Sequence, residues 1–303
     1  MTQTGTGVWT AQLDFQPANV IRDIAREIEE LGYRSVWVGE NVGREPFTQA
    51  GILLAATTRL LVGTGVVNIW ARDPLSTLAA QLTLAEAYPG RFILGLGVSH
   101  AYLVESIRGL QYRRPLTAMR DYLDAMDRMR ARYRAVQPDT VPRVLAALGP
   151  AMLTLAAQRA DGAHTYLVPP EHTEFARRLL GPDRTLIVEQ AVVINRDPNT
   201  ARAIARSHVR RYLPLVNYTN NLRRLGFNDT DFQNHGSDRL IDRLVAWGDV
   251  PTINKRIEEH RQAGADHICL QAITDDLRAL PTAQWRQMAP NPPATRDAST
   301  EPA

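Results

Sequence analysis

Cysteine and lysine are almost absent from this sequence. Its 303 residues contain one cysteine, Cys269, which excludes an intrachain disulfide. Lys255 is the single lysine among 35 basic residues. Schiff-base aldolases and pyridoxal phosphate enzymes need a lysine in the active site, and Lys255 falls early in an expected helix. The composition therefore disfavours both of these enzyme classes.

Long apolar runs and a strong excess of one charge are also lacking. No stretch approaches the roughly 18 residues that a membrane-spanning helix requires. The first residues, MTQTGTGVWTAQ, lack the basic start and the apolar stretch of a signal peptide. The net charge of +3 comes from dispersed basic residues accompanied by 32 acidic ones. We therefore expect a cytoplasmic protein that binds neither membranes nor nucleic acid.

A helix followed by a glycine and a short apolar strand recurs along the chain. The pattern appears four times, with its glycine at Gly32, Gly90, Gly162 and Gly264. This spacing is typical of the tight loops that lead from a helix into a strand. The chain is therefore expected to alternate helices with strands.

Eight short apolar segments are predicted to be strands. Four follow the glycines, in YRSVWVGE, RFILGLG, AHTYLV and ADHICLQ, and the others are GVWT near 7–10, LLVGTGVV at 60–67, RVLAAL at 143–148 and TLIVEQAVV at 185–193. Helical patterns separate most of them, and their continuous apolar character is typical of strands buried on both faces. The pattern predicts a parallel (β/α)8 TIM barrel, with a doubly wound sheet as the alternative.

Two connections are long and carry helical periodicity. They span residues 101–140, after the fourth strand, and 194–265, between the seventh and the eighth. We expect them to be helical insertions at one end of the barrel, within a single domain of residues 1–289. Residues 290–303 are rich in Pro, Ala and Thr without periodicity, which predicts a disordered tail.

Chemistry in such a barrel sits at the carboxyl ends of the strands. The residues at those positions are polar and aromatic, and they include Trp9, Glu40, Asn41, Asn68, Trp70, Ser99, His100, Tyr166, Glu189 and Gln271. They show no metal-ligand spacing and no carboxylate cluster, so no metal site is expected.

Two glycine-containing segments invite a comparison with phosphate-binding loops. GLGVSH has His100 where a dinucleotide fingerprint needs its third glycine, so that interpretation fails. Gly149 and Pro150 stand at the start of an expected helix, where free N–H groups suit an anion, although an ordinary turn is the alternative. Asp73 and Pro74 begin another helix, whose capping carboxylate would repel an anion.

The order and wording of the segments resemble the luciferase-like monooxygenase superfamily, in particular its F420-dependent oxidoreductase branch. The segments are GVWT, ELGYRSVWVGE, TRLLVGTGVVNIWARDP, AEAYPGRFILGLGVSH, ALGPAMLTLAAQRADGA and HRQAGADHICLQ, and they run from about Gly7 to Gln271. The resemblance implies a barrel with extra segments, usually dimeric, that binds coenzyme F420 or FMN at its C-terminal mouth.

The resemblance also implies roles for particular residues. In related deazaflavin enzymes the third strand bulges against the coenzyme ring with a non-prolyl cis peptide, which here would be Gly65–Val66. The loop that matches the family's coenzyme phosphate loop is Gly149, Pro150, Ala151 and Met152, and the other expected coenzyme contacts are Glu40, Asn68, Ser99 and His100. The expected substrate-binding residues are Trp9, Asn41 and Trp70.

One departure from the family pattern bears on the chemistry. Several deazaflavin dehydrogenases place an Asp–His pair after the second strand, whereas this chain has Glu40–Asn41. An asparagine donates a hydrogen bond but does not shuttle a proton. The first candidate for an acid or base is therefore His100, and the second is Glu189.

The leading functional hypothesis is an F420-dependent oxidoreductase that moves a hydride between the deazaflavin C5 and a small organic substrate. An FMN-linked monooxygenase on the same barrel is the first alternative. The second is a coenzyme-binding relative that has lost turnover. A homodimer is expected from the family resemblance alone.

Overall fold

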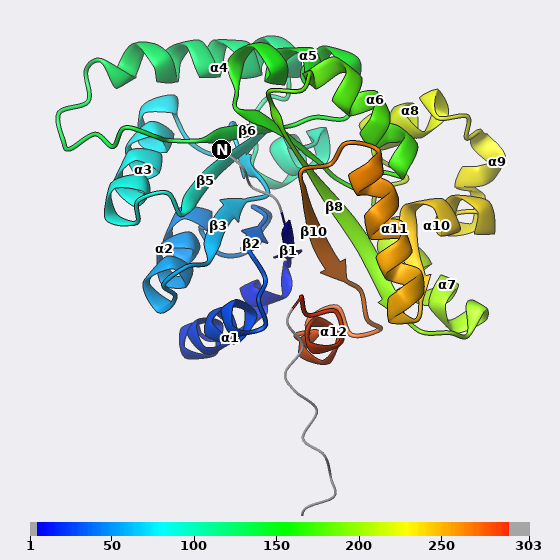
Figure 1. The fold of residues 1–303 in the computed structure, drawn as a ribbon. Helices are drawn as coiled ribbons and strands as arrows, with labels where there is room; N and C mark the ends of the chain where they lie inside the picture. The colour runs from blue at the N-terminus through cyan, green and yellow to red at the C-terminus, as the bar shows by residue number, and fades with distance from the viewer. Residues whose placement is uncertain (1–4, 291–303) are drawn as a thin grey trace, which may run out of the picture.

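A closed barrel of parallel strands forms the centre of the molecule (Figure 1). The computed structural model describes residues 5–290. The barrel strands are β1 (Gly5–Trp9), β2 (Ser35–Val38), β3 (Leu61–Thr64), β5 (Phe92–Gly97), β6 (Arg143–Ala146), β7 (Gly162–Thr165), β8 (Thr185–Ile194) and β10 (His267–Ala272). Strand β10 pairs with both β1 and β8, which closes the barrel. The predicted (β/α)8 architecture and the position of each predicted strand are confirmed.

The barrel interior is filled by side chains. Trp37 is fully buried at its centre. Gly63 of the neighbouring strand provides the space for the Trp37 indole, because a Cβ on Gly63 would lie 2.4 Å from it. His164 and Cys269 are also buried. A larger apolar core lies between the strands and the surrounding helices, as buried parallel sheets require.

The helices begin at signals that the sequence carries. Their bounds are α1 (Ala18–Glu30), α2 (Pro46–Ala56), α3 (Pro74–Ala87), α4 (Pro115–Arg130), α5 (Pro150–Arg159), α6 (Pro170–Leu180), α7 (Pro198–Val209), α8 (Val216–Arg224), α9 (Asp229–Phe232), α10 (Asp238–Leu244), α11 (Val250–Gln262) and α12 (Thr282–Gln287), with short 3-10 turns at Gln12–Phe15 and Gln233–His235. Asp73 caps α3 by accepting from the amides of Leu75 and Ser76, as predicted. Proline follows the cap in several of them, because the first helical amide has no intrahelical acceptor to lose.

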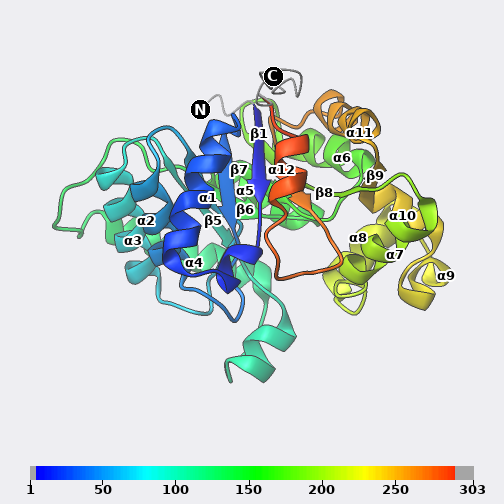
Figure 2. The ribbon, with the colours of Figure 1, turned by 90° about the horizontal axis from the view of Figure 1, so that it is seen from below.

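The connection after β5 is less of an insertion than expected. It begins with a π-helix, η2 (Tyr102–Ile107), and continues into α4, which packs against α3 and α5 as part of the helical ring. The connection between β8 and β10 is the larger elaboration and holds α7 to α11. In both views α7 to α10 lie on the opposite side of the barrel from α1 to α3 (Figures 1 and 2).

Two short strands depart from the simple pattern. Strand β4 (Val67–Asn68) continues the third barrel strand beyond a break. Strand β9 (Val245–Gly248) pairs with the last residues of β8 and was not predicted. It is only four residues long and follows α10 without an intervening loop residue, so it carries no turn signal of its own.

No helix among residues 5–290 combines the length and the apolar character that crossing a bilayer would take. The predicted tail, residues 290–303, lies outside the described residues except for Pro290. The assignment of residues 1–289 to one domain stays a prediction.

Candidate active site

The third barrel strand breaks at the predicted position. Strand β3 ends at Thr64, the Gly65–Val66 peptide is cis, and pairing with β5 resumes at Val67. The indole Nε1 of Trp9 donates to the Gly65 carbonyl oxygen at 3.0 Å. The predicted bulge is confirmed, whereas its contact with a coenzyme ring stays a prediction.

Two glycines of β5 make room for this bulge. A Cβ on Gly95 would lie 2.0 Å from the Thr64 carbonyl oxygen, and one on Gly97 would lie 2.5 Å from the Val66 Cγ2. The Thr64 hydroxyl also donates to the Gly95 carbonyl at 2.9 Å and accepts from its amide at 2.8 Å. Gly95 therefore allows the neighbouring Thr64 backbone to approach closely, and Gly97 makes room for the Val66 side chain.

Glu40, an expected coenzyme contact, lies at the end of β2 within a cluster of arginines. Its carboxylate accepts from both terminal nitrogens of Arg72, at 2.8 and 2.9 Å, and from Arg108 at 3.2 Å. It also accepts from the Asn68 amide at 2.7 Å. Since the side chain is only 5% exposed, the arginines compensate a charge that burial would otherwise penalise. The carboxylate thus holds the end of β2 to β4.

Asn68 and Trp70 form the next part of the mouth. The Asn68 Oδ1 accepts from the Trp70 amide, and the Trp70 indole donates to the Val98 carbonyl at 2.9 Å. The indole also packs against Tyr112, with ring centroids 5.8 Å apart. Asn41 is exposed beside this group. The structure therefore brings Glu40, Asn68 and Trp70 together.

Ser99 and His100 follow β5 at the same edge. Ser99 adopts a left-handed backbone with φ of 56°, which is uncommon outside glycine and asparagine. The His100 ring lies 5.7 Å from the ring of Tyr218 in α8. Burial lowers the pKa of His100, and a hydrogen bond with Asn217 opposes this. The imidazole is therefore neutral at physiological pH.

The start of α5 has the character predicted for an anion site. Gly149 is its N-cap, no side chain caps it, and Pro150 is the first helical residue. A Cβ on Gly149 would lie 3.5 Å from the Arg224 Nη2, which extends from the last turn of α8. The amides of Ala151 and Met152 in the first turn add the positive end of the helix dipole. The Arg224 guanidinium therefore lies beside the N-terminus of α5.

A cluster of aromatic side chains covers the interior of the barrel at this mouth. Trp9 packs edge-on against Tyr166, with centroids 5.2 Å apart. The Tyr166 hydroxyl donates to the Gln271 Oε1 at 2.7 Å and lies 2.7 Å from the Tyr212 hydroxyl. Tyr218 closes the cluster, 5.1 Å from the Tyr212 ring. We call Trp9, Tyr166, Tyr212 and Tyr218 the mouth cluster.

Sequence reasoning missed the members of this site that the insertion supplies. Tyr212, Tyr218 and Arg224 all lie in residues 194–265, which the sequence predicts only as a helical insertion at one end of the barrel. The one signal available in the sequence is the presence of two tyrosines in this connection. Trp9 is 8% exposed and supports the bulge and Tyr166, and its predicted contact with substrate stays a prediction.

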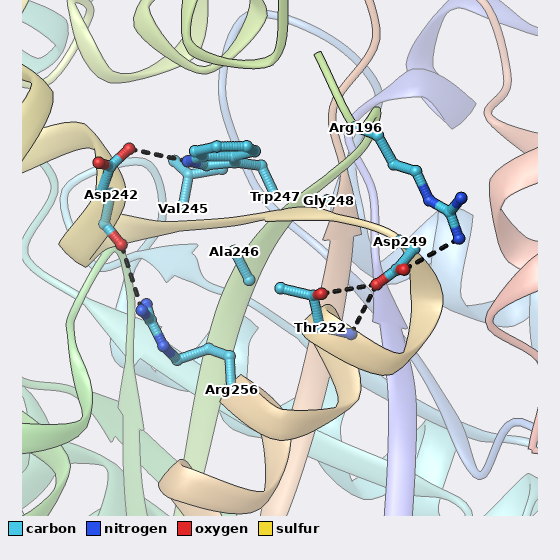
Figure 3. Close-up of a pocket in the computed structure, with 9 residues that line it drawn as sticks. All are labelled: Arg196, Asp242, Val245, Ala246, Trp247, Gly248, Asp249, Thr252 and Arg256. Atoms are coloured by element: carbon cyan, nitrogen blue, oxygen red, sulfur yellow. Dashed lines mark hydrogen bonds and ion pairs between the residues drawn. The ribbon is translucent and has the colours of Figure 1, made fainter. Parts of the chain in front are cut away.

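A pocket of about 410 Å³ lies elsewhere, beside β9 and the start of α11 (Figure 3). Its charged groups are paired, since Arg196 meets Asp249 at 3.0 Å and the Trp247 indole donates to Asp242 at 2.8 Å. None of the predicted site residues lines it. Among residues 5–290, no three His, Cys, Asp or Glu side chains gather as a metal ion would need.

The geometry defines a (β/α)8 barrel whose polar and aromatic groups converge at the C-terminal mouth around a bulged third strand. Residues 1–267 match the family described as luciferase-like monooxygenase. The chain belongs to this family.

The curated relatives include one that is described as dependent on coenzyme F420. A putative coenzyme F420-dependent oxidoreductase of Mycobacterium tuberculosis is 31% identical over 185 residues, which cover 52% of each chain. The 5,10-methylenetetrahydromethanopterin reductase of Methanolobus tindarius is 26% identical over 186 residues, or 55% of this chain and 57% of the relative. The matched part of the chain thus spans about half the length of these relatives.

Solved structures share the fold at low sequence identity. An F420-dependent secondary alcohol dehydrogenase, in complex with an F420-acetone adduct, superposes with a TM-score of 0.72 at 18% identity, covering 90% of this chain and 94% of that one. The oxygenating constituent of 3,6-diketocamphane monooxygenase from Pseudomonas putida, in complex with FMN, has a TM-score of 0.72 at 13% identity, with coverage of 95% and 97%.

Proposed function

We propose that this protein is an F420-dependent oxidoreductase that transfers a hydride between the deazaflavin C5 and a small organic substrate. The observation that carries the proposal is the break in the third barrel strand at Gly65–Val66, at the barrel mouth, in a chain whose curated relatives include one described as a putative coenzyme F420-dependent oxidoreductase.

The residues at the mouth fit such a coenzyme. The bulge presents backbone atoms, held from below by Trp9, as a flat support for one face of a ring. The start of α5 and Arg224 would bind a coenzyme phosphate, because the helix dipole and the guanidinium both favour negative charge there. When bound, the deazaflavin supplies hydride chemistry at C5. The protein's own groups orient it and exclude water.

Asn41 and Trp70 are the proposed substrate contacts on one side of the mouth, with the mouth cluster opposite. Asn41 is exposed and its amide is available to a ligand. Trp9 supports this site from the barrel interior. A carbon at position five of the deazaflavin favours two-electron hydride transfer, so the substrate needs a bond that accepts or releases a hydride.

Titration of the purified protein with F420 and with FMN tests the proposal. We expect tight F420 binding and weak FMN binding. Arg224→Gln should lower F420 affinity about tenfold or more, since a charge-assisted hydrogen bond contributes about 1.5–3 kcal/mol. Arg223→Gln, which breaks an exposed pair with Asp229, is the matched control. Tight FMN binding without F420 binding would overturn the proposal.

Tight FMN binding without F420 binding would favour an FMN-linked monooxygenase. The supporting observation for this alternative is the fold shared with the FMN-bound Pseudomonas putida structure. Binding of F420 without oxidation of the reduced coenzyme by any electrophile would favour an inactive relative, as Glu40–Asn41 in place of an Asp–His pair suggests. We also propose that the protein is cytoplasmic and that it forms a homodimer. Light scattering after gel filtration would test the homodimer.

A further inference from the structure

His172 is a buried histidine that contacts the turn at the start of α5. It lies in the first turn of α6 and is fully buried, with its ring packed on Phe175 at a centroid distance of 5.9 Å. Its Nε2 donates to the carbonyl oxygen of Leu148 at 2.9 Å. Leu148 directly precedes Gly149, the N-cap of α5. The hydrogen bond therefore holds the residue from which the predicted anion site begins.

The hydrogen-bond partners of His172 define its protonation. A carbonyl oxygen can only accept, so the proton lies on Nε2. Nδ1 is buried and has no hydrogen-bond partner within residues 5–290, so a second proton there would create a buried cation without an acceptor. In agreement, burial lowers the pKa of His172 to about 4, against the opposing effect of the Leu148 carbonyl, and the charge of Arg224 lowers it further. His172 is therefore a neutral donor at physiological pH.

Leu148 lies where two apolar cores meet. Its side chain packs against the core between the barrel strands and the helical ring, and also against the core formed by α7 to α10. Arg224, the last residue of α8, extends toward Gly149 from the second of these cores. A shift of Leu148 would change the distance between the α5 amides and the Arg224 guanidinium. His172 opposes such a shift, because a carbonyl that loses its donor in a buried position is destabilised.

The next residue, Thr173, connects the same turn of α6 with the insertion. Its hydroxyl donates to Nδ1 of His260 at 2.8 Å, and Nε2 of His260 donates to Oε1 of Gln190 at 2.8 Å. The Gln190 side-chain nitrogen donates to the carbonyl of Leu244, the last residue of α10, at 3.1 Å. The side chains of this chain of hydrogen bonds are buried. Two adjacent residues of α6 therefore hold the turn before α5 on one side and the insertion on the other.

Arg224 is available to an anion. It is exposed, and within residues 5–290 no carboxylate pairs with it. Its Nη2 makes one long hydrogen bond, of 3.4 Å, with Oδ1 of Asn221. The α5 amides beside it have no capping side chain. A guanidinium next to an uncapped helix N-terminus favours a phosphate group.

We propose that His172 is the positioning residue of this anion site and that its hydrogen bond to Leu148 keeps the start of α5 in place beside Arg224. The inference rests on the proposed function, in which the site binds the phosphate of the coenzyme. His172 acts through the Leu148 carbonyl and does not touch the ligand. Its effect is therefore confined to the phosphate end of the coenzyme.

Binding of two deazaflavins, with and without a phosphate, tests this role. We would titrate the wild type, His172→Phe and His172→Gln with F420 and with the deazaflavin that carries only the ribityl chain. His172→Phe should weaken F420 binding about tenfold, because the displaced phosphate loses a charge-assisted hydrogen bond, and should leave the phosphate-free compound unaffected. His172→Gln keeps an N–H donor for Leu148 and should restore most of the affinity.

The matched control removes a comparable hydrogen bond elsewhere. Tyr33→Phe loses a buried bond of 2.8 Å to the Trp285 carbonyl, far along the chain from the anion site. It should bind both compounds as the wild type does. His172→Asn, whose shorter amide does not reach Leu148, is a second variant of the same kind as His172→Phe and keeps the test decisive where the phenylalanine variant does not fold.

A double-mutant cycle shows whether His172 acts through Arg224. His172→Phe should lose most of its effect on F420 affinity in the Arg224→Gln background, because the guanidinium that it aligns is then absent. Urea midpoints measured in parallel identify any loss of binding that comes from unfolding. Fully additive losses in F420 affinity would overturn positioning through Arg224.

Inorganic phosphate gives a readout without the coenzyme. Phosphate should raise the thermal midpoint of the wild type with concentration, and raise that of His172→Phe less. Wild-type affinity of His172→Phe for both F420 and phosphate overturns the positioning role alone. A wild type that binds phosphate in a His172-dependent manner but binds no F420 overturns the proposed function and supports this role. A wild type that binds neither overturns both.

Discussion

Single residues decide whether the third strand can bulge. Gly95 and Gly97 stand against the break, at distances where a Cβ would overlap Thr64 or Val66. The sequence shows both glycines, and glycine within a strand permits the close approach of either a ligand or a neighbouring part of the chain. Only the packing of β5 on β3 and β4 shows that the Thr64 backbone and the Val66 side chain fill the space.

Gly97→Ala should destabilise the protein and displace the bulge. The new methyl would lie 2.5 Å from the Val66 Cγ2 and 3.3 Å from the Ala146 Cβ, and overpacking of this kind costs about 1–3 kcal/mol. We expect a lower urea midpoint and weaker F420 binding. Gly51→Ala in α2 is the control, because its methyl would meet only Leu84 at 3.7 Å. An unaffected Gly97→Ala protein would show that Val66 is free to move.

At the scale of elements, the starts of helices are encoded locally. An aspartate caps three of the helices: Asp73 precedes α3, Asp197 precedes α7 and Asp249 precedes α11. Each carboxylate accepts a hydrogen bond from an amide of the first turn. A sequence-local contact of this kind depends on no distant residue, so it was predictable for α3. Strand β9 was not predictable from the sequence. Its four residues form a strand because they pair with β8, and they carry no strong local signal of their own.

Asp73→Ala should cost about 1 kcal/mol by removing the α3 cap. The Ser76 hydroxyl, helped by backbone amides, lowers the pKa of Asp73 below its ordinary 3.8. The cap therefore stabilises the protein fully above that pH and loses its effect as pH falls through the lower, folded value. Asp73→Asn should retain most of the stability without this acid dependence. Equal thermal midpoints for Asp73→Ala and the wild type at neutral pH would contradict the capping role.

At the scale of the whole molecule, buried histidines set the response to acid. Burial lowers the pKa of His164 and His172 to about 4, and that of His208 and His260 to about 3. Their ordinary pKa of 6.5 applies once the chain unfolds. At a pH between the folded and the unfolded pKa values, the unfolded state therefore binds protons that the folded state does not bind.

The protein should therefore lose stability as pH falls below about 6.5. Each of the four histidines contributes roughly 1–2 kcal/mol of this loss by about pH 5, since one pKa unit corresponds to about 1.4 kcal/mol. Urea midpoints measured from about pH 7 to pH 5 test the prediction. His260→Gln keeps an acceptor and a donor for Thr173 and Gln190 and should reduce the slope. A urea midpoint that stays constant across this pH range would contradict the predicted loss of stability.

The sequence by itself determined the order of the strands, the barrel they form, the start of α3 and α5, and the place of the cis bulge. These features follow from apolar periodicity, local capping and a family resemblance carried by contiguous segments. They involve residues close together in the chain.

Only the tertiary structure decided which side chains meet. Glu40 and Arg72 are 32 residues apart, and Tyr166 and Gln271 are 105 apart, yet each pair is within 3 Å. Arg224 reaches Gly149 from an inserted helix, and the fully buried Glu189 carboxyl accepts from the amide of Leu167, 22 residues away. Local propensity carries no information on these contacts, because they depend on how the closed barrel and its insertion pack together.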